Sequence, residues 1–97
     1  MSITYGIWSY MGWQELSEIQ KSTLLALAHA CNWSLSAHVP VEAITRGVQS
    51  NLRGDAKKAL QQLQRKGYCY QHPTRGSMTW SLTVEGLKVA KMFVNKS

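Results

Sequence analysis

Residues 68–83, YCYQHPTRGSMTWSLT, restrict the fold of this chain more than any other stretch. Two short runs of alternating side-chain character flank the sequence Pro73-Thr74-Arg75-Gly76. Alternation with a period of two is typical of half-buried strands, and Pro and Gly favour the dihedral angles of a tight turn. The stretch therefore predicts a β-hairpin that carries Arg75 at its tip.

The same stretch contains Cys69 and His72, a spacing that also occurs in metal sites. Residues three apart on a strand point to opposite faces, so these two side chains cannot easily share one ion. Tetrahedral zinc needs four converging ligands, which usually come as close pairs, and His29, Cys31 and His38 supply no such pair. We predict no metal site and no cofactor, with Cys31 in the core and Cys69 a packed or half-exposed strand thiol.

Helical spacing of apolar residues precedes the hairpin in two segments, residues 14–32 and the short run 41–48. Asn32 can adopt the left-handed conformation that ends the first of these helices. Between them, residues 36–39 are interpreted as a short strand, and Pro40 is expected at the first turn of the second helix.

A third helix is predicted over residues 51–66, with Asn51 as its N-cap and Gly67 at its end. Its apolar stripe consists of Leu52, Ala56, Ala59, Leu60 and Leu63. A last helix over 84–95 is capped by Thr83 and has an apolar edge of Leu87, Ala90, Phe93 and Val94. The predicted class is α+β, mainly α with a small β-hairpin, in the order helix, short strand, helix, helix, hairpin, helix.

Charge is distributed unevenly along the chain, whose net charge is +6 with a pI near 9.6. Residues 1–44 carry a net charge of −2, and residues 45–97 carry +8. A basic half joined to a mildly acidic half indicates a surface for a polyanion, although a solvated Lys-rich surface would give the same count.

The polar face of the predicted third helix concentrates part of this charge. Lys and Arg neutralise phosphates, and Arg and Gln also form paired hydrogen bonds with base edges. An ordinary solvated helix is the alternative interpretation. The candidate residues on this helix are Arg53, Gly54, Lys57, Lys58, Gln61 and Arg65, and those on the hairpin are His72, Thr74, Arg75 and Ser77.

Signals for other protein classes are weak in this sequence. It has no Gly-x-Ser-x-Gly motif and no Gly-rich phosphate loop, and its five acidic residues are few for an acid–base site, so we predict no catalytic residues and no enzyme. The longest apolar run, residues 23–31, is too short to cross a bilayer. The N-terminus does not resemble a secretory signal, and the two cysteines fit a reduced, cytoplasmic protein.

Two sequence motifs resemble a known family. The run AL-x-x-L-x-x-KGY at 59–68 and the run W-x-LT-x-x-G-x-x-x-A at 80–90 are similar to the winged helix-turn-helix domains of bacterial and archaeal regulators, including MarR- and PadR-type proteins. The resemblance implies that helix 51–66 enters the major groove of DNA and that the wing, 68–82, contacts the backbone. It implies base or phosphate contacts for Arg53, Lys57, Lys58 and Gln61, with Arg75 on the wing.

The resulting hypothesis is a single winged-helix domain over 1–97, with a core at 14–95 and an aromatic extension at 1–13, that binds double-stranded DNA and regulates transcription. Trp8 and Trp13 in the extension either pack on the domain or form a dimer contact. A homodimer is expected through helix 84–95, the extension, or both. The alternatives are a winged-helix protein-interaction module and a replication or mobile-element protein that binds RNA or DNA ends.

Overall fold

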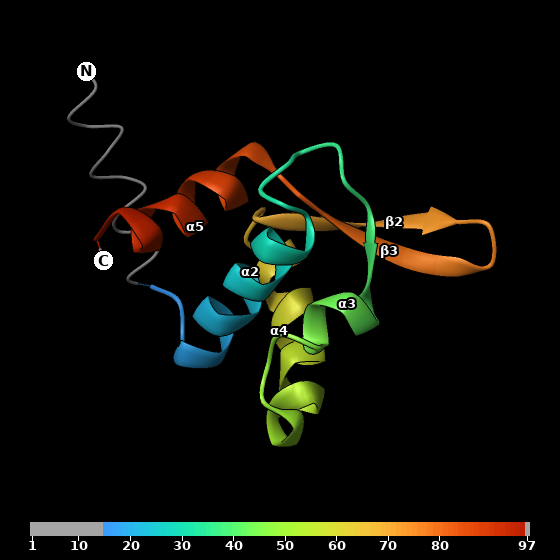
Figure 1. The fold of residues 1–97 in the computed structure, drawn as a ribbon, viewed down its shortest axis with the longest axis horizontal. Helices are drawn as coiled ribbons and strands as arrows, with labels where there is room; N and C mark the ends of the chain where they lie inside the picture. The colour runs from blue at the N-terminus through green and yellow to red at the C-terminus, as the bar shows by residue number, and fades with distance from the viewer. Residues whose placement is uncertain (1–14, 97) are drawn as a thin grey trace.

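The computed structural model describes residues 15–96, which form four α-helices and one small antiparallel sheet (Figure 1). In chain order the elements are α2 Glu18–Ala30, β1 Val39–Pro40, α3 Val41–Thr45, the 3-10 turn η1 Ser50–Leu52, α4 Arg53–Arg65, β2 Cys69–Thr74, β3 Ser77–Leu82 and α5 Val84–Lys96. The predicted α+β class is confirmed. The predicted aromatic extension, residues 1–13, lies outside the described residues. None of the described helices combines the length and apolar character needed to span a bilayer.

Helix α2 begins at a capping box, in which two residues bond each other's backbone N–H. Ser17 Oγ accepts from Gln20 N at 3.3 Å, and Gln20 Oε1 accepts from Ser17 N at 3.0 Å. This box starts the helix later than the predicted residue 14. At the other end Asn32 has φ 54° and Trp33 has φ 59°. The left-handed conformation predicted for Asn32 is therefore confirmed.

The corner between α3 and α4 differs from the predicted one. Asn51 was expected to be the N-cap of α4, and this prediction is wrong, because Asn51 lies inside η1 and Leu52 occupies the cap position without a side-chain bond. The physical reason is burial: Val48 is 7% exposed and Leu52 packs against the core, so the chain turns tightly between them. Arg53 Nε then donates to the Thr45 carbonyl at 3.2 Å and joins the two helices.

Helix α4 is amphipathic as the sequence indicates. Ala56, Ala59, Leu60 and Leu63 are all buried, which confirms four of the five predicted stripe positions. The helix ends where Gly67 takes φ 86° and Tyr68 N donates to Leu63 O at 3.0 Å. This hydrogen bond turns the chain directly into the hairpin.

The sheet has the strand order β1-β3-β2, so β3 is its central strand. The turn of the hairpin is shorter than the predicted four residues. It contains only Arg75 and Gly76, with Gly76 at φ 84°, because Pro73 pairs with Met78 and Thr74 with Ser77 inside the ladder. The first strand is also displaced, from the predicted 36–39 to Val39–Pro40, where Val39 pairs with Trp80.

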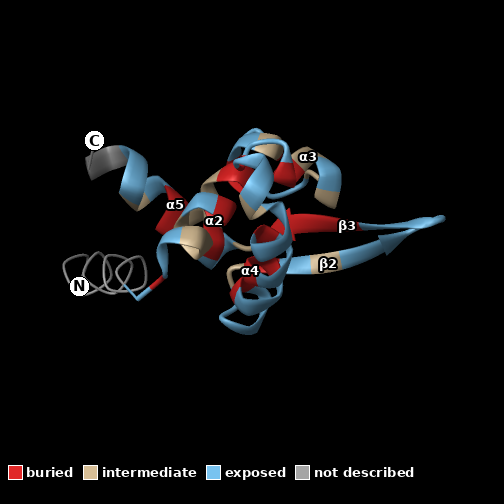
Figure 2. Cartoon of the chain, turned by 90° about the horizontal axis from the view of Figure 1, so that it is seen from below, coloured by how far each residue is buried: buried red, intermediate tan, exposed pale blue. Residues whose placement is uncertain are grey.

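Residues 79–82 of β3 are buried on both faces of the sheet. On one face Trp80 and Leu82 join the core beside Cys69, whose thiol donates to the Leu60 carbonyl. On the other face Ser81 Oγ donates its proton to Ala37 O at 2.7 Å and accepts from His38 Nδ1 at 2.8 Å. Figure 2 shows the result: buried residues gather in the helices and β3, whereas the end of the hairpin is exposed.

Helix α5 starts at the predicted cap, because Thr83 Oγ1 accepts from Gly86 N at 3.0 Å. Thr83 Oγ1 also donates to Gly67 O at 2.6 Å, which fastens α5 to the end of α4. Ala90 on the predicted apolar edge is buried, but Phe93 and Val94 further along are 43% and 47% exposed. Among the described side chains of this helix, Val89 and Ala90 belong to the core and Leu87 packs against it.

Position 86 must be glycine because α5 lies very close to the backbone of Tyr68. A Cβ atom at position 86 would overlap the Tyr68 carbonyl oxygen, which is backbone and cannot rotate away. We expect Gly86→Ala to lower the free energy of unfolding by about 3 kcal/mol, a typical cost of overpacking. Urea denaturation followed by circular dichroism measures this change. Gly54→Ala is the control, since position 54 is exposed helix with open space, and it should raise stability by about 0.5–1 kcal/mol.

Alkaline pH should destabilise the fold through its buried thiols. Burial, with a smaller contribution from the nearby Cys31, raises the pKa of Cys69 from 9.0 to about 12. The folded protein therefore retains a proton that the unfolded chain releases, and stability present below pH 9 is lost as the pH rises toward 12. At pH 10.5 the loss from Cys69 is about 2 kcal/mol. Urea denaturation at pH 8 and at pH 10.5 measures this loss in the free energy of unfolding. If a Cys31→Ala, Cys69→Ala double variant lost as much stability, the buried thiols would not be its cause.

Candidate nucleic-acid interface

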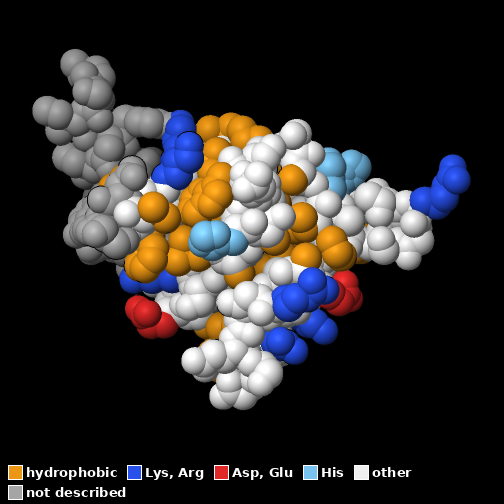
Figure 3. Space-filling view, viewed as in Figure 1, with side chains coloured by type: hydrophobic (Ala, Val, Ile, Leu, Met, Phe, Trp, Pro, Cys, Tyr) orange, Lys and Arg blue, Asp and Glu red, His pale blue; other side chains and the backbone are white. Residues whose placement is uncertain are grey.

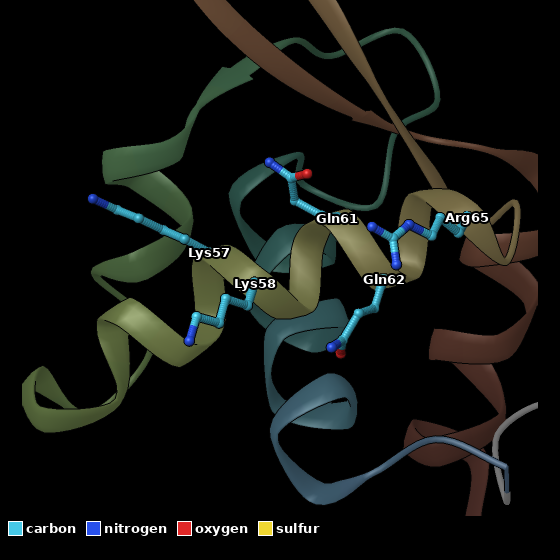
Figure 4. A pocket seen from close by; sticks show the side chains of 5 residues that line it. All are labelled: Lys57, Lys58, Gln61, Gln62 and Arg65. Carbon is cyan, nitrogen blue, oxygen red and sulfur yellow. The ribbon is translucent and has the colours of Figure 1, made fainter.

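The outer face of α4 carries a shallow hollow of about 320 Å³. Figure 4 shows the five side chains around it, which project from the face opposite the buried Ala/Leu stripe. The lining residues are Lys57, Lys58, Gln61, Gln62 and Arg65. They follow two rows with a spacing of four, so the helix itself places them side by side. We call this set the α4 face.

The positive charges of the α4 face are not neutralised within the described residues. No carboxylate there lies within salt-bridge distance of Lys57, Lys58 or Arg65. The two acidic residues closest to this region in sequence, Glu42 in α3 and Asp55 in the first turn of α4, do not line the hollow. Three cations and two amides therefore face solvent together, an arrangement that attracts a polyanion.

The hairpin presents a second cationic position. Arg75 is exposed in its two-residue turn, and Thr74 Oγ1 lies 3.2 Å from Ser77 O and 3.1 Å from Ser77 Oγ, which closes the tip. Figure 1 shows the hairpin projecting beyond the helices, and Figure 3 shows basic side chains over the α3–α4 region and again at the hairpin's far end. Helix α4 packs beside β2, and both lie below α2 and α3 in the view of Figure 2.

Other predicted site residues have different surroundings. Arg53 is tied to the α3 carboxyl end by its bond to Thr45 O, and Gly54 is exposed with open space around it. His72 lies on the sheet face opposite Cys69, where its ring meets the ring of His38 edge-on at 4.5 Å. The structure therefore brings Lys57, Lys58, Gln61 and Arg65 together around the hollow, which His72 does not line.

The Cys69 and His72 pair does not converge on a common point. Cys69 points into the core toward Leu60, while His72 points to the opposite face of the sheet. Within residues 15–96 no group of three His, Cys, Asp or Glu side chains is placed to hold a metal ion.

One lining residue, Gln62, is absent from the candidates that the sequence suggests. Its side chain accepts a hydrogen bond from Gln20 Nε2 at 2.7 Å, and Figure 4 shows it pointing toward α2. Gln62 follows Lys58 by four residues, so helical spacing alone places it on the same row. The spacing alone could have predicted the position of Gln62, but it could not have predicted the hydrogen bond to Gln20, which lies 42 positions away.

Comparison with known proteins adds no family to this description. No protein-family model matches the chain, and no curated protein is significantly similar to it.

Proposed function

We propose that this protein is a winged helix-turn-helix regulator of transcription that binds double-stranded DNA. In this proposal α4 lies in the major groove and the β2–β3 hairpin contacts the phosphate backbone. The α4 face carries the proposal, because its three cations have no carboxylate partner among the described residues and α4 packs against β2 of the hairpin that carries Arg75 in its turn.

The arrangement of elements supports the same interpretation. Helix α3 is followed by a tight turn and then by α4. The next element is the β2–β3 hairpin, whose second strand, β3, also pairs with the short β1. A helix pair joined by a short turn holds its second helix outward, with one face on the core and the other toward solvent. The homodimer, through helix 84–95, the aromatic extension or both, and the cytoplasmic location remain predictions.

Salt dependence tests the electrostatic part of the proposal. About five phosphate contacts should make log affinity fall with log salt at a slope of about −4 to −5. Fluorescence anisotropy with a labelled random duplex, from dilute to physiological salt, gives this slope. An affinity that does not change with salt, or the absence of any binding at low salt together with capture of an acidic protein, would favour the protein-interaction alternative.

The two lysines of the α4 face should account for part of that slope. In a Lys57→Ala, Lys58→Ala double variant we expect the magnitude of the slope to fall by about 2, since each lost phosphate contact removes about one unit. Lys91→Ala is the control, because Lys91 is an exposed lysine on α5. If Lys91→Ala lowered the magnitude of the slope by about one unit, as each lysine of the double variant should, net charge alone would drive binding.

Arg75 and Gln61 should differ in the kind of binding that they support. Arg75→Ala should weaken binding to every duplex by a similar factor, because a backbone contact carries no sequence information. Gln61→Ala should change the preferred sequence, because an amide can pair with an adenine edge. Selection from random duplexes, carried out with each variant, distinguishes the two. An unchanged preference in Gln61→Ala would remove that residue from base recognition.

A further inference from the structure

The side-chain amide of Gln20 in α2 is hydrogen-bonded at both of its ends. Its Oε1 accepts from the backbone N–H of Ser17 at 3.0 Å as part of the capping box. Its Nε2 donates to Gln62 Oε1 on α4 at 2.7 Å. One amide therefore connects the first turn of α2 with the α4 face.

These bonds determine which way the two amides point. A backbone N–H can only donate, so the Gln20 atom that meets Ser17 N must be the oxygen. The nitrogen of Gln20 is then directed at Gln62, and the Gln62 atom that receives it must also be an oxygen. Gln62 is left with its NH₂ group, two donors, for any partner outside the protein.

This orientation makes the α4 face rich in donors. Lys57, Lys58 and Arg65 have donors only, and one of the two lone pairs of the Gln62 oxygen is already used by Gln20. Within the lining, the side-chain oxygen for which no hydrogen bond is used inside the protein belongs to Gln61. Phosphate oxygens only accept, whereas base edges present both donors and acceptors. Lys58, Gln62 and Arg65 therefore suit phosphate oxygens, whereas Gln61, with both donors and an acceptor, suits a base edge that presents both.

We propose that Gln62 donates to a phosphate of the bound nucleic acid and that Gln20 is the positioning residue that engages the Gln62 oxygen and leaves its NH₂ group for the phosphate. The proposal rests on the proposed function, and it deepens it by dividing the α4 face into a phosphate-contacting set, Lys58, Gln62 and Arg65, and a base-contacting position, Gln61. The chemical class recognised at Gln62 is a phosphate oxyanion, in a phosphodiester backbone or as a free ion.

A pair of matched variants tests the contact itself. Gln62→Glu and Gln64→Glu each add one negative charge at an exposed position of α4, two residues apart, and only position 62 lines the hollow. We expect Gln62→Glu to weaken binding to a random duplex by about tenfold more than Gln64→Glu, in anisotropy titrations at fixed salt. Equal losses for the two variants would overturn the proposal.

The role of Gln20 is tested with Gln20→Glu. A glutamate keeps the acceptor that the capping box needs but cannot donate to Gln62. The Gln62 amide should therefore turn, so that its NH₂ group bonds the new carboxylate and its oxygen is left for the ligand. We expect affinity for duplex to fall about fivefold with an unchanged urea midpoint. In a Gln62→Ala background the same change should cost at most about twofold. An equal cost in both backgrounds would mean that the introduced carboxylate acts through its charge alone, and would overturn the positioning role.

Side-chain amide resonances separate failure of this inference from failure of the proposed function. In ¹H–¹⁵N spectra, with signals assigned from the variants, the Gln62 NH₂ pair should shift on addition of either a short duplex or inorganic phosphate. Chloride at equal ionic strength should leave it unchanged, and Gln64 should not respond. If duplex binds while the Gln62 signal stays fixed, DNA binding stands and the phosphate contact is overturned. If phosphate shifts Gln62 but duplex does not bind, the phosphate contact stands and the DNA-binding proposal fails.

Discussion

Burial of the Ala/Leu stripe of α4 determines which side chains of this helix face solvent. Leu60 and Leu63 are fully buried, and α4 packs on α2 along this stripe. Fixing one side of a helix in a core fixes the opposite side in solvent, because side-chain direction follows the 3.6-residue repeat. The cations at 57, 58 and 65 therefore face outward as a consequence of hydrophobic packing, and their mutual repulsion is tolerated there because water screens exposed charges.

Local chemistry explains which parts of the fold were predictable. The end of α4 follows from Gly67, the start of α5 from Thr83, and the left-handed end of α2 from Asn32, since each residue acts on its own backbone within a few positions. The buried stripe and the solvent-facing position of the α4 face both follow from the 3.6-residue repeat of the helix. These features require no knowledge of which distant segments meet.

The features that were not predicted all depend on contacts between distant segments. The 3-10 turn before α4 replaces the expected Asn51 cap because Val48 is buried and Leu52 packs against the core, and local capping preference, about 1 kcal/mol, cannot oppose these two contacts. The edge-on contact of the His72 ring with His38 was not predicted either, because it depends on how β2 pairs with β3. Likewise, nothing near Gly86 in sequence indicates that the Tyr68 carbonyl occupies the space of its missing side chain.

The Gln20–Gln62 bond combines both kinds of contact, and this has a consequence for how the α4 face forms. The N–H of Ser17 is among the groups at the start of α2 that no helical carbonyl can satisfy, so the Gln20 oxygen is drawn to it by local chemistry. The nitrogen at the other end of the same amide is then already oriented when α4 packs against α2, and it selects one of the two orientations open to Gln62. An isolated α4 helix would present Gln62 as either donor or acceptor, with no preference from its own backbone. The donor pattern of the α4 face is therefore a property of the packed helix pair, and a change in the first turn of α2 can alter it without touching α4.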